Sequence, residues 1–395
     1  MQKTNRMNNE DSFWGRLREQ RATKRPFFVL APMADVTDPA FRRIIAKYGK
    51  PDVMWTEFVS ADGLMLGGRE HLIRDLLYTE AERPIIAQLF GSNTETMRAA
   101  AKLCTELGFD GIDINMGCPD KSIEKQGAGA AIIKTPDIAI AIIRAAREGI
   151  AQAVAENTND ATGKPIRTIP LSVKTRIGYT KNEINTWLPT LLKENLAAIT
   201  VHCRTRKEMS SVPARWEHIQ EVAALRDQIA PETLIIGNGD VRDMEHGREL
   251  AEKYGADGVM IGRSIFGNPW LFADAQKNDA QKKTFHSFFP STFFQKIRNS
   301  FAAFLQNYFG IKNRYWLRNA APAGVSKEEK LCVLIEHCKL YEELLGDIKS
   351  FSIMKKHFKA YVHGWPGSKE LRMELMEAQS AADVERTIKH FIDTK

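Results

Sequence analysis

Long apolar runs and metal-binding cysteine patterns are both missing from this sequence. No apolar stretch approaches the roughly 20 residues that a membrane span requires. Residues 1–25 are polar and charged, so we expect no secretory signal. The five cysteines form no Cys-x-x-Cys pair and have no companion cluster of histidines, which argues against a zinc or iron–sulfur site. We therefore expect a cytoplasmic protein in a reducing compartment that binds no metal ion and no membrane.

The length and composition of the chain indicate more than one folding unit. Its 395 residues are 43% apolar and 27% charged, which is enough apolar material for a large core. A (β/α)₈ barrel takes about 250 residues, and this leaves room for a second, smaller unit. We expect the protein to be a monomer.

Eight short β-rich runs alternate with helical patterns, as in repeated βα units. The predicted strands are residues 27–31, 52–56, 85–88, 111–115, 171–174, 198–202, 234–237 and 258–261. Helical spacing of apolar residues marks 94–107 and 136–148 between them. This count predicts an α/β fold, a TIM (β/α)₈ barrel. A doubly wound open sheet is the alternative, but its glycine-rich turn would follow the first strand, whereas here glycines cluster after the seventh and eighth.

The chain divides into four predicted segments. Residues 1–26 are a polar N-terminal extension, 27–272 the barrel, 273–291 a connection, and 292–395 a smaller all-α domain. Within that last domain we predict helices at 292–310, 327–345, 348–362 and 369–392, with a break at Gly364–Gly367. A polar, turn-rich stretch at 155–167 reads as a surface insertion.

Most of the net positive charge lies near the C-terminus. The whole chain carries +7, and residues 273–395 hold 20 basic against 14 acidic residues. Such a segment suits a polyanionic partner, although a lysine-rich solvated face would give the same count.

Cys118 stands on a short turn after a predicted buried strand. The run 111–119 reads GIDINMGCP, and Pro119 stiffens the turn. In a barrel, the loops after the strands build the active site, so this thiol is a candidate catalytic group. Free cysteines more often serve as small buried apolar residues, and that interpretation stays open.

Two glycine-bearing turns follow the seventh and eighth predicted strands. They contain Asn238, Gly239 and Asp240, and then Gly262 and Arg263. Backbone N–H groups at small residues, together with the arginine, are typical of a phosphate site in barrels.

Other strand ends complete the pattern of a flavin mononucleotide (FMN) site. Pro32, Met33 and Ala34 form an apolar floor after the first strand. Gln88 suits the pyrimidine edge of the flavin, and Lys174 suits the negative charge of its reduced form. Taken singly, Gln88 and His202 would be ordinary structural residues.

These motifs together resemble the tRNA-dihydrouridine synthases, closest to their bacterial B-type branch. The matching runs, in order, are residues 30–38, 88–91, 113–119, 173–178, 201–206, 238–241 and 262–263, and the C-terminal run 357–367 resembles the helical domain of that branch.

The resemblance implies FMN, a tRNA substrate, and reduction of uridine to 5,6-dihydrouridine, with NADPH or NADH as reductant. It implies FMN contacts at the positions named above, from Pro32 to Arg263, including His202, and it makes Cys118 the proton donor to C5 of the uracil. A thiol of pKa about 8.5 is protonated at neutral pH and suits that task. We also expect tRNA contacts from Asn115, Arg176, Arg204, Lys355, Lys356 and Lys359.

Some positions depart from the family pattern. Cys203 stands where relatives usually have glycine, residues 207–216 follow the pattern loosely, and the stretches 155–167 and 273–315 are unusual. Two other functions stay open. One is an FMN barrel dehydrogenase acting on a small pyrimidine, and the other is an RNA-binding protein without catalysis.

Overall fold

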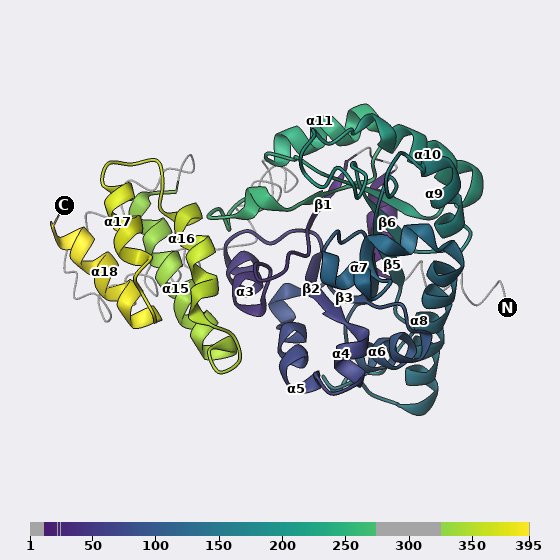
Figure 1. Ribbon diagram of the computed structural model, residues 1–395, viewed down its shortest axis with the longest axis horizontal. Helices are drawn as coiled ribbons and strands as arrows, with labels where there is room; N and C mark the ends of the chain where they lie inside the picture. The colour runs from purple at the N-terminus through teal and green to yellow at the C-terminus, as the bar shows by residue number, and fades with distance from the viewer. Residues whose placement is uncertain (1–11, 22, 24, 274–324, 395) are drawn as a thin grey trace, which may run out of the picture. The chain divides into compact units, whose positions relative to one another are not determined.

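The computed structural model describes residues 12–21, 23, 25–273 and 325–394. The chain divides into two compact units, Met1–Ser264 and Ile265–Lys395, and each is described by itself (Figure 1). Among the helices of the described residues, none combines the length and apolarity needed to cross a bilayer.

The first unit is a closed barrel of eight parallel strands, as predicted. The strands are β1 (Phe27–Leu30), β2 (Met54–Ser60), β3 (Ile85–Phe90), β4 (Gly111–Met116), β5 (Leu171–Arg176), β6 (Ala198–His202), β7 (Leu234–Asn238) and β8 (Gly258–Ile261). Their order is β1-β8-β7-β6-β5-β4-β3-β2. A parallel bridge between Val29 and Val53 closes the ring, with Leu30 N donating to Val53 O at 3.2 Å.

The second strand differs from its predicted range. Residues 52–56 were expected, but β2 runs four residues further, and its register with β3 shifts between Trp55 and Phe58. The acidic Glu57 interrupts the apolar pattern in the sequence, yet it is 4% exposed because it accepts a hydrogen bond from Asp35 N.

Helices follow the strands and cover the outside of the barrel (Figure 1). They are α3 (Pro39–Tyr48), α4 (Ala61–Met65), α5 (Arg69–Leu72), α6 (Thr94–Glu106), α7 (Lys121–Lys125), α8 (Pro136–Glu156), α9 (Ile184–Leu192), α10 (Glu217–Ile229) and α11 (Met244–Tyr254), with the 3₁₀ turns η1 (Ile73–Leu76), η2 (Glu80–Glu82), η3 (Gly129–Lys134) and η4 (Arg263–Ile265). Side-chain caps from Asp38, Asn93 and Asp243 begin α3, α6 and α11. Helix α8 extends to Glu156, into the stretch predicted as an insertion.

A short N-terminal helix belongs to the barrel rather than to a separate polar extension. In α2 (Phe13–Arg21), Phe13, Trp14 and Leu17 are buried in one apolar cluster with residues of β1, β2, β3, β7 and β8. The Trp14 and Trp55 rings lie 6.1 Å apart, centroid to centroid. The segment has only these three large apolar side chains among many charged ones, so its composition did not indicate that it packs on the barrel.

The described part of the second unit is helical, as predicted. Its elements are α15 (Lys327–Leu345), η6 (Phe351–Met354), α16 (Lys355–Tyr361), α17 (Ser368–Leu375) and α18 (Ala381–Thr394). The predicted helix 369–392 is wrong as a single element, because Ser380 Oγ accepts from Asp383 N and starts a new helix. The predicted helix 348–362 begins instead as η6. The predicted helix 292–310 lies outside the described residues.

We predict that Trp14→Ala destabilises the barrel by about 3–5 kcal/mol, since the indole is 0% exposed and its removal leaves a cavity. Urea unfolding followed by circular dichroism measures the change. The matched control is Arg16→Ala on the exposed side of the same helix, which we expect to change stability by less than about 0.5 kcal/mol. Equal effects of the two substitutions would contradict the packing role of Trp14.

Candidate functional site

Strand pairing brings several of the predicted polar side chains to one end of the barrel. Register pairs join Asn115 of β4 to Lys174 of β5, and His202 of β6 to Asn238 of β7. Gln88 of β3 donates to and accepts from side chains of β4. All of these residues lie in the carboxyl-terminal parts of their strands, where barrel enzymes carry their chemistry.

The turn that carries Cys118 is held by hydrogen bonds at both sides. Asn115 Oδ1 accepts from Gly117 N at 3.0 Å and from Cys118 N at 2.9 Å. Ala130 N donates to Cys118 O at 2.9 Å. Gly129 has a φ of +61°, and a Cβ there would lie 2.8 Å from Cys118 O, so only glycine fits this close approach.

The thiol of Cys118 is half-buried in an apolar setting. It packs against a cluster formed by Phe90, Ile123 and Ala128, with Phe58 beside it. Burial raises the pKa of the Cys118 thiol above its ordinary value, although the nearby charges of Lys174 and Arg176 act the other way. The thiol therefore keeps its proton at neutral pH.

Lys174 is a mostly buried cation at the end of β5. Burial, and then the neighbouring charge of Arg176, lower the pKa of its ammonium to about 8, and the carboxylate of Asp113 opposes them. Within the described ranges, no group hydrogen-bonds to this ammonium. A buried cation of this kind gains from an anionic or strongly polar ligand.

His202 is neutral and has a fixed tautomer. Its Nε2 lies 3.1 Å from Nη1 of Arg204, which can only donate, so the ring proton is on Nδ1. Burial and the charges of Arg176 and Lys174 hold the pKa of His202 well below 6.5. The side chain therefore offers a single N–H donor to a ligand.

The two glycine turns lie beside His202 and Arg263. Gly239 has a φ of +125°, and a Cβ there would lie 2.7 Å from Ala214 and 3.2 Å from the His202 ring. Asp240 Oδ1 accepts from Arg263 Nη2 at 2.8 Å, and the Arg263 side chain is 69% exposed. The Arg263 guanidinium is thus paired on one side and exposed on the other, where its remaining N–H groups can meet an anion.

Two predicted cofactor contacts turn toward the protein. Asn238 Nδ2 donates to Met260 O at 2.9 Å, which joins β7 to β8. The carboxylate of Asp240 is taken up by Arg204, Arg263 and Ala214 N, so Asp240 orients the arginines.

The apolar floor after β1 meets the last glycine turn. A Cβ added at Gly262 would lie 3.5 Å from both Ala31 and the Met33 sulfur, and Met33 packs against the barrel core. Pro32 and Ala34 flank Met33 in the same loop.

Three residues predicted to contact tRNA are engaged within the barrel. Arg176 donates to the carbonyls of Gly117, Thr205 and Met209, and Arg204 donates to that of Val212 at 2.6 Å. The side chain of Asn115 is used by Gln88 and the Cys118 turn. In these positions the three side chains hold loops of the barrel together. Their contact with RNA stays a prediction. Lys355, Lys356 and Lys359 lie on α16 of the second unit.

Two residues that hold the site together, Arg206 and Asp113, were not found from the sequence. Arg206 donates to Glu124 at 2.7 Å and to the carbonyl of Pro119 at 3.3 Å, which ties the β6 loop to the Cys118 loop. Asp113 lies beneath Gln88, 0% exposed. Asp113 could have been found from the sequence, because it is a charged residue within an otherwise apolar run that predicts a buried strand.

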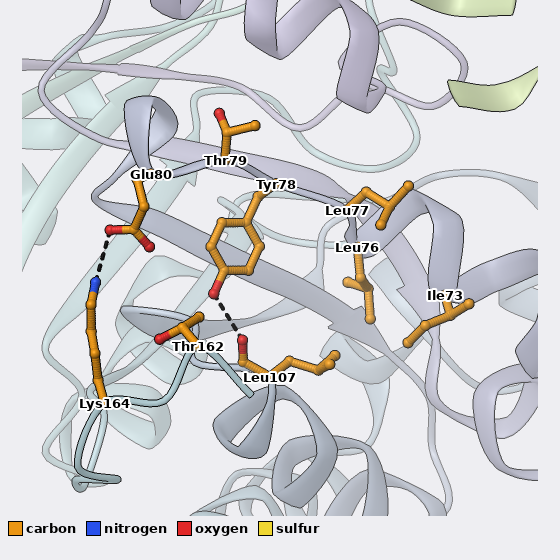
Figure 2. Close-up of a pocket in the computed structure, with 9 residues that line it drawn as sticks. All are labelled: Ile73, Leu76, Leu77, Tyr78, Thr79, Glu80, Leu107, Thr162 and Lys164. Carbon is orange, nitrogen blue, oxygen red and sulfur yellow. Dashed lines mark hydrogen bonds and ion pairs between the residues drawn. The ribbon is translucent and has the colours of Figure 1, made fainter. Parts of the chain in front are cut away.

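A separate cavity of about 630 Å³ lies at the amino ends of β3–β5 (Figure 2). Apolar side chains such as Leu76 and Leu77 line it, and its polar groups are paired: Lys164 with Glu80 at 2.8 Å, and Tyr78 with the Leu107 carbonyl at 2.8 Å. It includes none of the predicted site residues.

Comparisons with known proteins agree on one family. The family model described as dihydrouridine synthase matches residues 29–323. A probable tRNA-dihydrouridine synthase of Staphylococcus aureus (strain COL) is 35% identical over 385 residues, covering 97% of this chain and 96% of the relative. The probable tRNA-dihydrouridine synthase 2 of Bacillus subtilis (strain 168) is 35% identical, covering 96% and 97%. Morphinone reductase aligns over 64% of this chain and 86% of its own, at 13% identity and a TM-score of 0.43, too weak a likeness to bear on function.

We predict that iodoacetamide alkylates Cys118 more slowly at pH 7–8 than it alkylates a cysteine in a short unstructured peptide. The raised pKa leaves less thiolate, and the rate should go on rising beyond pH 9. Peptide mass spectrometry identifies the modified cysteine, and comparison with the Cys118→Ala variant shows how much of the total alkylation occurs at Cys118. A rate that levels off near pH 7 would show a lowered pKa and contradict this prediction.

Proposed function

Because the chain belongs to the dihydrouridine synthase family, we propose that its barrel binds FMN and that Cys118 delivers a proton to the uracil ring of a tRNA uridine. The sequence resemblance at family level is confirmed, and with it the reaction: the chain is a flavin-dependent enzyme that reduces uridines of tRNA to dihydrouridine. The remainder of this proposal concerns which residues do this and how.

The residues at the glycine turns fit the phosphate of FMN. Gly239 allows the β7 turn a φ of +125° close to Ala214 and His202, and the exposed Arg263 supplies charge. The neutral ring of His202 lies beside Gly239 with Cδ2 and Nε2 toward it, so this edge of the ring helps to shape the turn. This phosphate end favours FMN over a dinucleotide flavin, since we identify no sequence motif that would hold an adenosine.

The pyrimidine edge of the flavin would lie between Gln88 and Lys174. Gln88 is 0% exposed and bonded to Asp113 and Asn115, which leaves the second N–H of its Nε2 for the ring. The ammonium of Lys174 has no hydrogen-bond partner among the described residues and would meet the charge of the reduced ring. Met33 and its neighbours Pro32 and Ala34 would lie against the ring from the β1 loop. The nicotinamide reductant, NADPH or NADH, would use the same opening, as we recognise no second nucleotide-binding motif in the sequence.

The bound flavin would supply a hydride to C6 of the uracil. The ring then needs one proton at C5, and the protonated Sγ of Cys118 gives it, after which solvent returns a proton to the thiolate. The apolar cluster beside Cys118 covers part of the thiol and favours its protonated form. A uridine within folded tRNA must leave its stack to reach this depth, as in other enzymes that act on bases.

The single observation that carries the proposal is the position of the Cys118 turn beside Gln88 and Lys174 at the end of a flavin-family barrel. We further propose that the basic second unit binds the RNA backbone, with Lys355, Lys356 and Lys359 on α16 facing phosphates. A cytoplasmic location and a monomeric state remain predictions.

We predict that Cys118→Ala retains bound FMN and its reduction by NADPH, yet lowers dihydrouridine formation by about 10²–10⁴-fold, the usual contribution of a general acid. Mass spectrometry of tRNA from a strain that carries the variant as its sole copy measures the product. Cys104→Ala, on the outer helix α6, is the control and should retain activity. Near-normal turnover by Cys118→Ala would make this cysteine structural.

We predict that replacing Lys356 and Lys359 with Glu weakens tRNA binding and flattens its salt dependence by about one to two units of log–log slope, at about 0.7–0.9 per phosphate contact. NADPH oxidation should be unchanged. The same replacement of Lys193, directly after α9, and Lys253, in α11, both exposed, is the matched control. Equal slopes for the two double variants would place the RNA site elsewhere.

A further inference from the structure

Asp113 is a buried carboxylate directly beneath the proposed flavin site. It is 0% exposed, and its two oxygens each accept one short hydrogen bond. Ser172 Oγ donates to Oδ1 at 2.6 Å, and Gln88 Nε2 donates to Oδ2 at 2.6 Å. The proposed reaction needs no carboxylate, so the cost of burying this one calls for another reason.

Strand register explains why these side chains meet. Asp113 pairs with Gln88 of β3 on one side and with Ser172 of β5 on the other, while Asn115 pairs with Lys174. Residues two apart on a strand point the same way. Asp113 and Asn115 therefore lie on one face of β4, with Asp113 one layer deeper.

Three hydrogen bonds connect the carboxylate to the backbone of Cys118. Gln88 donates to Asp113, and Gln88 Oε1 accepts from Asn115 Nδ2 at 3.1 Å. Asn115 Oδ1 in turn accepts from Cys118 N at 2.9 Å. Every donor in this chain points toward Asp113.

An ionised carboxylate only accepts, so it sets that direction. It forces the NH₂ of Gln88 to face Asp113, which leaves Oε1 for Asn115. The NH₂ of Asn115 must then face Gln88, and its oxygen is left for the backbone N–H of Cys118. Turning either amide over would place two donors, or two acceptors, against each other.

We propose that Asp113 is a positioning residue whose charge orients Gln88 and Asn115, and so fixes both the edge offered to the flavin and the turn that carries Cys118. The inference rests on the proposed function of Gln88 and Cys118. Asp113 itself touches neither substrate nor Cys118.

The surroundings of Asp113 make its charge dependent on pH. Ser172 and Lys174 face it from β5, Gln88 from β3 and Trp55 from β2, and of these only Lys174 is charged. Burial raises the pKa of Asp113 to about 6, and the hydrogen bonds and Lys174 oppose it. As pH falls through that value the carboxyl gains a proton, becomes a donor, and the fixed direction of the chain is lost.

The test uses the full-length flavin-loaded protein and compares Asp113→Asn with Ser172→Ala. An asparagine can offer Gln88 either an oxygen or an NH₂, whereas Ser172→Ala leaves the carboxylate in place. We expect Asp113→Asn to slow reoxidation of the reduced flavin by tRNA about tenfold or more and to shift the visible absorption maximum of the flavin. Both variants are assayed at pH 8, where the carboxylate of Ser172→Ala is expected to stay ionised although it has lost one donor. Ser172→Ala should then stay within about threefold with an unshifted spectrum.

The pH profile gives a second readout that needs no stable variant. Wild-type reoxidation by tRNA should fall as pH drops below about 6, and Asp113→Asn, where it folds, should lack this acid limb. An unchanged rate and spectrum in Asp113→Asn, or a flat wild-type profile between pH 5 and 7, would overturn the inference. Wild-type protein that forms no dihydrouridine would instead overturn the proposed function.

Discussion

In-register pairing of neighbouring parallel strands is the constraint on which this site depends. Because β3, β4, β5 and β6 pair with few irregularities, side chains of equal parity face the same way and meet in layers. Gln88, Asn115 and Lys174 are brought together although 86 residues separate the first from the last. A one-residue slip in any of these pairs would turn the polar groups outward and break the hydrogen-bond chain.

Desolvation then gives each group its protonation state. The same burial raises the pKa of Cys118 and lowers those of Lys174 and His202, so each is driven toward its neutral form. A protonated thiol suits proton delivery, and a neutral imidazole offers one defined N–H. Of these three groups, Lys174 is the one that keeps its charge at neutral pH, and the nearby carboxylate of Asp113 supports that charge.

The sequence predicted the barrel well because strand and helix patterns are local. Strands β6 and β8 and helix α15 match their predicted bounds. Most candidate site residues of the barrel lie at the carboxyl ends of its strands, as expected. Other features depended on contacts between distant segments. The packing of α2, the buried Glu57 in β2 and the link from Arg206 to Glu124 have no local signature. From composition alone, Glu57, Arg206 and Glu124 would be surface charges, and α2 would be part of a polar extension.

Apolar packing that stabilises the barrel lies at the amino ends of its strands, and the polar side chains of the proposed site lie at the carboxyl ends. At the amino ends, α2 covers an apolar cluster in which Trp14 is fully buried, and ion pairs of Arg18 and Arg21 hold the rim of this packing. At the carboxyl ends, buried polar side chains are tolerated because almost every one has a partner, from Asp113 through Gln88 to Asn115. Lys174 is an exception, since its ammonium has no hydrogen-bond partner among the described residues and would gain from an anionic or strongly polar ligand. The apolar cluster at one end and the hydrogen-bonded side chains at the other are thus both built on the same eight strands, so the register that packs the core also places the polar groups.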